Sequence, residues 1–123
     1  MNKLAKKRYN KKRNDAYVYW SDDETIRIMF AFNNSCAYCG SKYNIELDHF
    51  IPIKRGGKTI PGNIYPVCRE HNRGKDGKHA KLPRDWAIWK FGFENGDSLY
   101  QDIKRILQIH YEGWYYRNST EVG

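Results

Sequence analysis

The sequence predicts a small α+β protein, in which a zinc site stabilises a short core of strand and helix flanked by further helices. An alternating polar and apolar segment lies at 45–51, helix-start patterns begin at Ser21 and Ser98, and two close pairs of cysteine and histidine bracket the alternating segment. At 123 residues the chain has the length of one ordinary domain. We therefore expect a short arm at 1–13 and a single domain over 14–123.

The first 13 residues are a basic arm. They hold seven of the 22 lysines and arginines and no acid, whereas the rest of the chain has 15 basic and 14 acidic residues. Nearly all of the net charge of +8 is therefore in the arm, which favours a flexible segment and an acidic partner such as nucleic acid. The arm residues expected to contact that partner are Lys3, Lys6, Lys7, Arg8, Lys11, Lys12 and Arg13.

A first helix is expected after the arm. Ser21 and Glu24 have the spacing of a capping box, with Ser21 at the N-cap and Glu24 at the third helical position. A helix of about three turns should follow and end just before Cys36. Its predicted inner face consists of Ile26, Met29, Phe30 and Asn33.

Two close pairs of residues with metal-binding side chains follow. Cys36-x-x-Cys39 and Cys68-x-x-His71 are separated by 28 residues, and each pair has the short spacing that clamps one tetrahedral ion. Four protein ligands leave no position for water, so the predicted zinc ion is structural. The alternative is a redox pair at Cys36 and Cys39 with Cys68 merely buried. A redox pair should open a helix in a βαβ unit, and this sequence context does not offer one.

The segment between these pairs predicts a strand and a loop. Residues 45–51 alternate as a strand does until Pro52 interrupts them. Two glycine-containing turns then form a loop that ends near Asn63, and a short helix is expected from about Val67.

The last third of the chain predicts a helical extension over 83–116. Residues 83–93 are rich in aromatic side chains and are compatible with either helix or strand. Ser98 to Gln101 is a second capping-box pattern, which opens a long amphipathic helix. Its apolar stripe consists of Leu99, Ile103, Ile106, Leu107, His110 and Trp114. We expect this stripe to pack over the central unit.

Composition excludes a membrane-spanning protein. No apolar run is longer than the five residues from Ile28 to Phe32, which is far too short to cross a bilayer. No export signal is visible, and three cysteines without one favour a reducing, intracellular location. Aromatic residues make up 15% of the chain, and a small core built from large rings explains most of them.

Residues 36–75 resemble the HNH endonuclease family. The resemblance lies in Leu47 to Pro52, the Gly56-Gly57 loop, Asn63, and Cys68-x-x-His71-Asn72-x-x-Lys75. It implies a ββα-metal fold with flanking zinc cysteines. The family usually has a second Cys-x-x-Cys pair followed at once by its final His, whereas here His71 and Asn72 stand at those two positions, as in the H-N-N variants. In an alternative register of the sequence against the family motif, His71 takes the place of the final catalytic His, and zinc keeps three protein ligands. The position of Lys75, three residues after Asn72, argues against that register.

The resemblance implies a metal-dependent DNA endonuclease. His49 would be the general base, because a neutral imidazole can take a proton from water near neutral pH. Asp48 and Asn72 would hold one Mg²⁺ or Mn²⁺ ion, and a second catalytic ion is not expected with so few carboxylates. Asn63 would orient His49 or tie down the loop, and Lys75 would contact DNA phosphate. Regular pleating puts Asp48 and His49 on opposite faces, so these roles require a strand end or a twist.

Other interpretations remain open at this point. His49 alternates with apolar residues and would fit a core histidine, and Asn63 and Asn72 would fit turn or cap residues. For the whole protein the alternatives are a non-catalytic, zinc-finger-like module that binds nucleic acid and a zinc-stabilised module that binds protein. Only the nuclease explains Asp48, His49, Asn63 and Asn72 at these spacings. The sequence does not indicate any protein partner.

Overall fold

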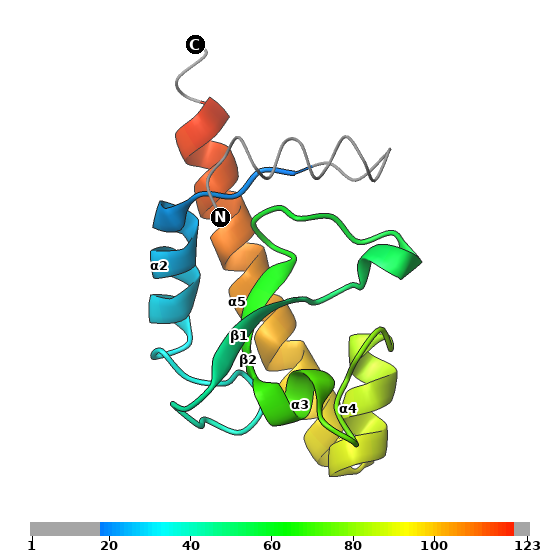
Figure 1. Cartoon of the computed structure of the whole chain (residues 1–123). Helices are drawn as coiled ribbons and strands as arrows, with labels where there is room; N and C mark the ends of the chain where they lie inside the picture. The colour runs from blue at the N-terminus through cyan, green and yellow to red at the C-terminus, as the bar shows by residue number, and fades with distance from the viewer. Residues whose placement is uncertain (1–17, 120–123) are drawn as a thin grey trace.

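The computed structural model describes residues 18–119, and the basic arm at 1–13 lies outside them. Helices and a two-stranded sheet alternate along the chain, so the predicted α+β class is confirmed (Figure 1). In chain order the elements are α2 (Asp22–Ala31), β1 (Ile45–His49), the 3₁₀ helix η1 (Ile53–Arg55), β2 (Ile64–Cys68), α3 (Arg69–Arg73), α4 (Pro83–Phe91) and α5 (Phe93–Ser119).

The two strands form an antiparallel hairpin at the centre of the molecule. Its register pairs Ile45 with Cys68 and His49 with Ile64, and α3 follows β2 directly. This gives the ββα unit that the family resemblance implies. All five residues of β2 are buried, so β2 lacks the alternation by which a strand is found in a sequence.

Helix α2 begins where the sequence predicts, but its inner face is different. Ser21 is the N-cap residue, yet its side chain makes no capping bond. Ile26 and Phe30 are 67% and 77% exposed, and the buried positions are Glu24 and Ile28. The predicted inner face was wrong because Glu24 turns inward to α5, where His110 and Arg117 contact its carboxylate.

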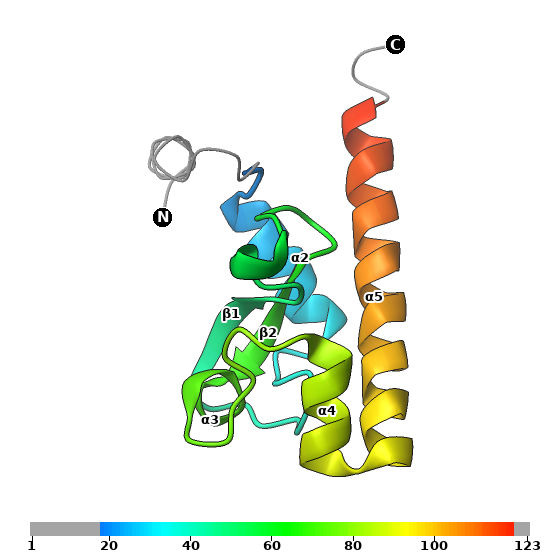
Figure 2. The same ribbon diagram turned by 90° about the vertical axis from the view of Figure 1, so that its right-hand side faces the viewer.

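The C-terminal part consists of two packed helices (Figure 2). The ambiguous segment is helix α4, which starts with Pro83 in the position that proline favours. Helix α5 begins at Phe93, ahead of the predicted start at Ser98. A Cβ atom on Gly96 would lie 2.3 Å from the carbonyl oxygen of Ala87, so this glycine allows α4 and α5 to approach closely. None of the helices in residues 18–119 is long and apolar enough to cross a membrane.

The core lies between the sheet, α4 and the inner stripe of α5. Ile103 and Leu107 of α5 are buried there, as the amphipathic pattern predicts. Large rings fill much of the remaining space: the rings of Tyr38 and Trp86 meet edge to face at 4.8 Å, and the hydroxyls of Tyr38 and Tyr65 are 2.6 Å apart. This core supports the hairpin from one side and leaves the loop between its strands at the surface.

Candidate active site and metal centre

Four metal-binding side chains meet where the turn after α2 approaches the start of α3. They are Cys36, Cys39, Cys68 and His71, and their ligand atoms all lie within 4.8 Å of one another. Sγ of Cys39 is 3.8 Å from Sγ of Cys68, which is 3.4 Å from Nδ1 of His71. A tetrahedron with Zn–S bonds of about 2.3 Å and Zn–N bonds of about 2.0 Å has edges of about 3.8 and 3.5 Å. The group could therefore hold a zinc ion.

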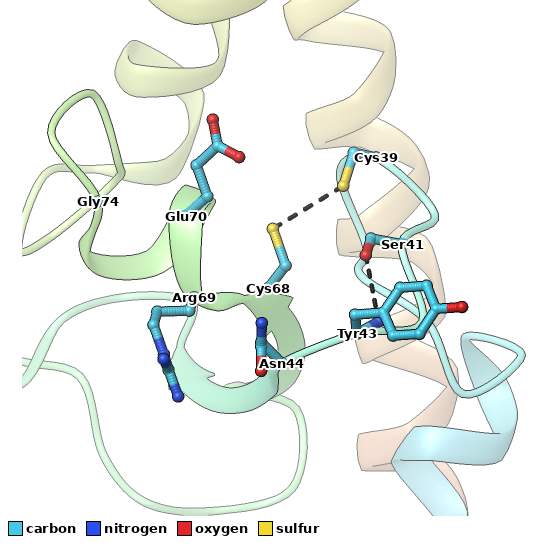
Figure 3. Close-up of a pocket in the computed structure, with 8 residues that line it drawn as sticks. All are labelled: Cys39, Ser41, Tyr43, Asn44, Cys68, Arg69, Glu70 and Gly74. Carbon is cyan, nitrogen blue, oxygen red and sulfur yellow. Dashed lines mark hydrogen bonds between the residues drawn. The ribbon is translucent and has the colours of Figure 1, made fainter.

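A tight turn and a helix start position the ligands of this group. The amide of Gly40 donates to the carbonyl oxygen of Cys36 at 2.9 Å, and Gly40 has a φ of 75°, which favours glycine. Cys68 is the N-cap residue of α3, and His71 is the third residue of that helix. Figure 3 shows Sγ of Cys39 and Sγ of Cys68 facing each other beside a surface hollow.

Burial shifts the pKa of two of these groups. It lowers the pKa of His71, which favours the neutral imidazole that a metal ion requires. Burial also raises the pKa of the Cys68 thiol to about 11, so a zinc ion must displace a proton to bind there. Zinc retention should therefore weaken as the pH falls. A zinc ion held by all four residues would have a closed coordination shell with no position for a substrate.

Asp48 contacts a lysine that sequence reasoning missed. The ammonium of Lys78 donates to Oδ2 of Asp48 at 3.1 Å and to the carbonyl oxygen of His49 at 2.9 Å. The Lys78 side chain is 0% exposed, and burial lowers its pKa while the Asp48 carboxylate opposes that shift. Lys75, which the family spacing selects, is exposed instead. The only sequence signal for Lys78 is that it is a second lysine, three residues after Lys75, and nothing in the sequence indicates that its side chain is buried.

His49 is the last residue of β1 and pairs with Ile64 of β2. Its Nε2 lies 2.8 Å from the hydroxyl oxygen of Thr59 in the loop between the strands. Thr59 is itself held by the segment before α2: it forms a parallel β-bridge with Val18, and its carbonyl oxygen accepts from the amide of Tyr19 at 2.8 Å. Sequence reasoning did not select Thr59, which belongs to no pattern of its own.

Asn63 ties down the loop between the strands. Its side-chain oxygen accepts from the amide of Ile51 at 2.8 Å, and its nitrogen donates to the carbonyl oxygens of Ile51 and Lys58 at 3.0 and 2.8 Å. Gly57 lies against the same place, where a Cβ atom would be 1.7 Å from the carbonyl oxygen of Ile51. All three bonds of the Asn63 side chain go to the main chain of the loop, and none of the three goes to His49.

Asn72, the expected metal ligand alongside Asp48, forms a hydrogen bond with Glu46. Its Nδ2 donates to Oε1 of Glu46 at 2.9 Å, and Arg73 contacts the same carboxylate at 2.7 Å. Glu46 and Asp48 are two residues apart on β1 and so lie on one face of the strand. The hydrogen bond from Arg73 lowers the pKa of Glu46 more than any other contact does. Asn72 is thus on the Asp48 side of the hairpin, paired with Glu46.

The structure separates two kinds of site. Within residues 18–119, Cys36, Cys39, Cys68 and His71 are the one group of three or more His, Cys, Asp or Glu side chains that could hold an ion. Asp48 is not part of this group, and its carboxylate contacts the Lys78 ammonium. The structure places His71 with the cysteines, as the first register predicts.

A family comparison agrees with this geometry. Residues 36–78 match the model of a family described as HNH endonuclease, which confirms the resemblance for that segment. The match covers both strands, α3, and the residues from Cys36 to Lys78. Comparison with curated proteins gives no significant match, and neither does comparison with solved structures.

Proposed function

We propose, with the HNH endonuclease match of residues 36–78 as the premise, that this protein is a DNA endonuclease that hydrolyses phosphodiester bonds with one divalent metal ion. One arrangement supports this proposal above all. Asp48 and His49 are the last two residues of β1, on a hairpin whose loop is tied down by Asn63. The hairpin thus holds a carboxylate and an imidazole in fixed positions. In phosphodiester hydrolysis the carboxylate can bind a metal ion and the imidazole can act as the base.

Each residue has a task in the proposed reaction. His49 takes a proton from the attacking water, whose oxygen bonds to phosphorus as the bond to the 3′ oxygen breaks. To do so, Nε2 of His49 must exchange its contact with Thr59 for the water. The 3′ oxygen leaves as an alkoxide and takes a proton from solvent water, which gives 5′-phosphate and 3′-hydroxyl ends. Asp48 and the side-chain oxygen of Asn72 would hold Mg²⁺ or Mn²⁺, which supplies positive charge for the phosphate oxygens in the transition state.

A structural zinc ion completes the proposed fold. It would be held by Cys36, Cys39, Cys68 and His71, whose separations fit a tetrahedral site. The turn after α2 and the start of α3 have no other covalent or metal link in the described residues, so zinc binding would contribute directly to folding.

The basic arm is the proposed DNA-binding segment. It precedes Val18 in the chain, and in the described residues Val18 bridges to Thr59, which contacts His49. The seven arm cations would neutralise DNA phosphates, and the exposed Lys75 would add another contact to phosphate.

Incubation of supercoiled plasmid with Mg²⁺ or Mn²⁺, with and without EDTA, tests the proposal. The nuclease should convert the plasmid to open-circular or linear DNA, and EDTA should stop the conversion. A zinc-finger-like module that only binds nucleic acid would retard the plasmid on a gel without cutting it. A module for protein binding would neither retard nor cut the plasmid.

A further inference from the structure

A completely buried lysine contacts both residues of the proposed catalytic pair, Asp48 and His49. Lys78 is 0% exposed, and its ammonium contacts Asp48 through the side chain and His49 through the main-chain carbonyl. A buried ammonium loses its hydration, so its side chain is seldom placed in an interior unless its contacts matter. A buried ion pair is also weak evidence for a role in stability.

We infer that Lys78 is a positioning residue of the active site, which fixes the Asp48 carboxylate and the backbone of His49 in their working places. This inference rests on the proposed nuclease function. It adds a residue that neither the family match nor the sequence pattern assigns to that function.

Lys78 acts at the end of the paired part of the hairpin. The pair of His49 with Ile64 is the last in the register of the sheet, and beyond it the amide of Phe50 donates to the carbonyl oxygen of Asn63 at 2.8 Å. One ammonium that contacts two successive residues, Asp48 and His49, adds a further restraint to this strand end. The contact to Asp48 uses Oδ2 and so restrains the carboxylate, and Oδ1 would be the oxygen available to the metal ion of the proposed mechanism.

The backbone of Lys78 is anchored in turn to the group that could hold zinc. Its amide donates to the carbonyl oxygen of His71 at 2.7 Å. Gly77, just before it, lies so close to α3 that a Cβ atom would be 2.8 Å from the carbonyl oxygen of Glu70. The position of the ammonium is therefore fixed by the segment that carries His71. Through Lys78, the structural metal site and the proposed active site share one rigid connection.

Four variants test this inference: Lys78→Met, Asp48→Asn, the double variant, and the control Lys104→Met. Methionine keeps the length of the lysine stem and removes the ammonium, and Lys104 is an exposed lysine on α5. The single-turnover cleavage rate at saturating DNA and metal should fall about 10- to 100-fold in Lys78→Met, the usual loss when a residue that orients a metal ligand is removed. DNA affinity should be unchanged, and Lys104→Met should cleave as the wild type does.

Thermal unfolding supplies a measurement that does not depend on cleavage. Asp48→Asn leaves the buried ammonium without its carboxylate, so its melting temperature should fall. Adding Lys78→Met to that variant should raise the melting temperature again, a non-additive effect that is expected of two residues in contact. If the wild type does not cleave, the nuclease proposal fails while this coupling still reports on the contact itself.

Three results would overturn the inference. Cleavage by folded Lys78→Met at the wild-type rate would show that Lys78 does not position the active site. Melting temperatures that simply add would show that Lys78 and Asp48 do not interact. If Lys78→Met does not fold, Lys78→Gln takes its place, since its amide can still donate; failure of both variants to fold would assign Lys78 to stability alone.

Discussion

The Sγ atoms of Cys39 and Cys68 lie 3.8 Å apart, although 28 residues separate the two cysteines in the chain. Cys39 is exposed on a tight turn, whereas Cys68 is buried at the start of α3. Their separation equals the edge of a tetrahedral zinc site, about 3.8 Å. The turn before β1 and the start of α3 thus approach each other at the distance that a shared zinc ion requires.

Loss of one zinc ligand should unfold the protein. Cys68→Ser removes a buried ligand, and a core of this size depends on its metal, so the variant should lose its cooperative thermal transition. The wild type should show a lower melting temperature after treatment with a strong chelator. Elemental analysis should find about one zinc per chain in wild type purified without chelator; a zinc-free, folded wild type would refute the site.

Exchange of one zinc ligand for another should be tolerated. His71→Cys supplies a thiolate in place of an imidazole, and both are common zinc ligands, so zinc content and cooperative unfolding should be retained. Plasmid cleavage should be retained too, because His71 is not in the proposed reaction. A variant that keeps its zinc but loses cleavage would instead place His71 in the catalytic role of the alternative register.

His110 should make stability depend on pH. Burial lowers the pKa of His110, and the cations of Arg117 and Arg27 add to this while the contact with Glu24 opposes it. The unfolded chain, with a histidine pKa of about 6.5, then binds a proton more readily than the folded protein does. The melting temperature should therefore fall as the pH drops below about 6.5.

The variant His110→Gln isolates this effect, because its amide can still donate to Glu24, as Nε2 of His110 does, but cannot take up a proton. The fall in melting temperature between about pH 7.5 and pH 5.5 should be smaller in His110→Gln than in the wild type. An equally steep fall in both proteins would mean that His110 keeps an ordinary pKa in the folded state.

Deletion of residues 1–13 should weaken DNA binding at every sequence. In the proposed function the arm would neutralise phosphates without reading bases, so its contribution would come from counterion release. Loss of about four phosphate contacts would reduce the slope of log K against log salt concentration by about 3.6. The single-turnover rate at saturating DNA should be unchanged. An arm that confers only solubility would leave both affinity and slope as they are.

Sequence reasoning succeeds where the signal is local. The two Cys/His pairs are recognisable because each ligand lies three residues from its partner, and the structure groups all four. The strand at 45–51 was predicted from alternation and from Pro52, and the structure ends it at His49. Helix α2 starts at Asp22 for the equally local reason that Ser21 precedes three acidic residues.

The residues whose burial the sequence did not predict have partners far away in the chain. Glu24 is buried because His110 and Arg117 meet it, across 86 and 93 residues. Lys78 is buried because Asp48 lies 30 residues before it. A pattern of hydrophobic residues contains no information about such pairs, so it assigns both side chains to the surface. Thr59 was missed for the same reason.

The central claim is that His49 is the general base of a metal-dependent nuclease, and one comparison tests it most directly. The single-turnover cleavage rates of wild type and His49→Ala are measured at saturating Mg²⁺ or Mn²⁺ and saturating DNA, with melting temperature and DNA affinity as controls. We predict that His49→Ala cleaves about 10²- to 10⁴-fold more slowly, with both controls nearly unchanged. Cleavage by His49→Ala at the wild-type rate would contradict the claim.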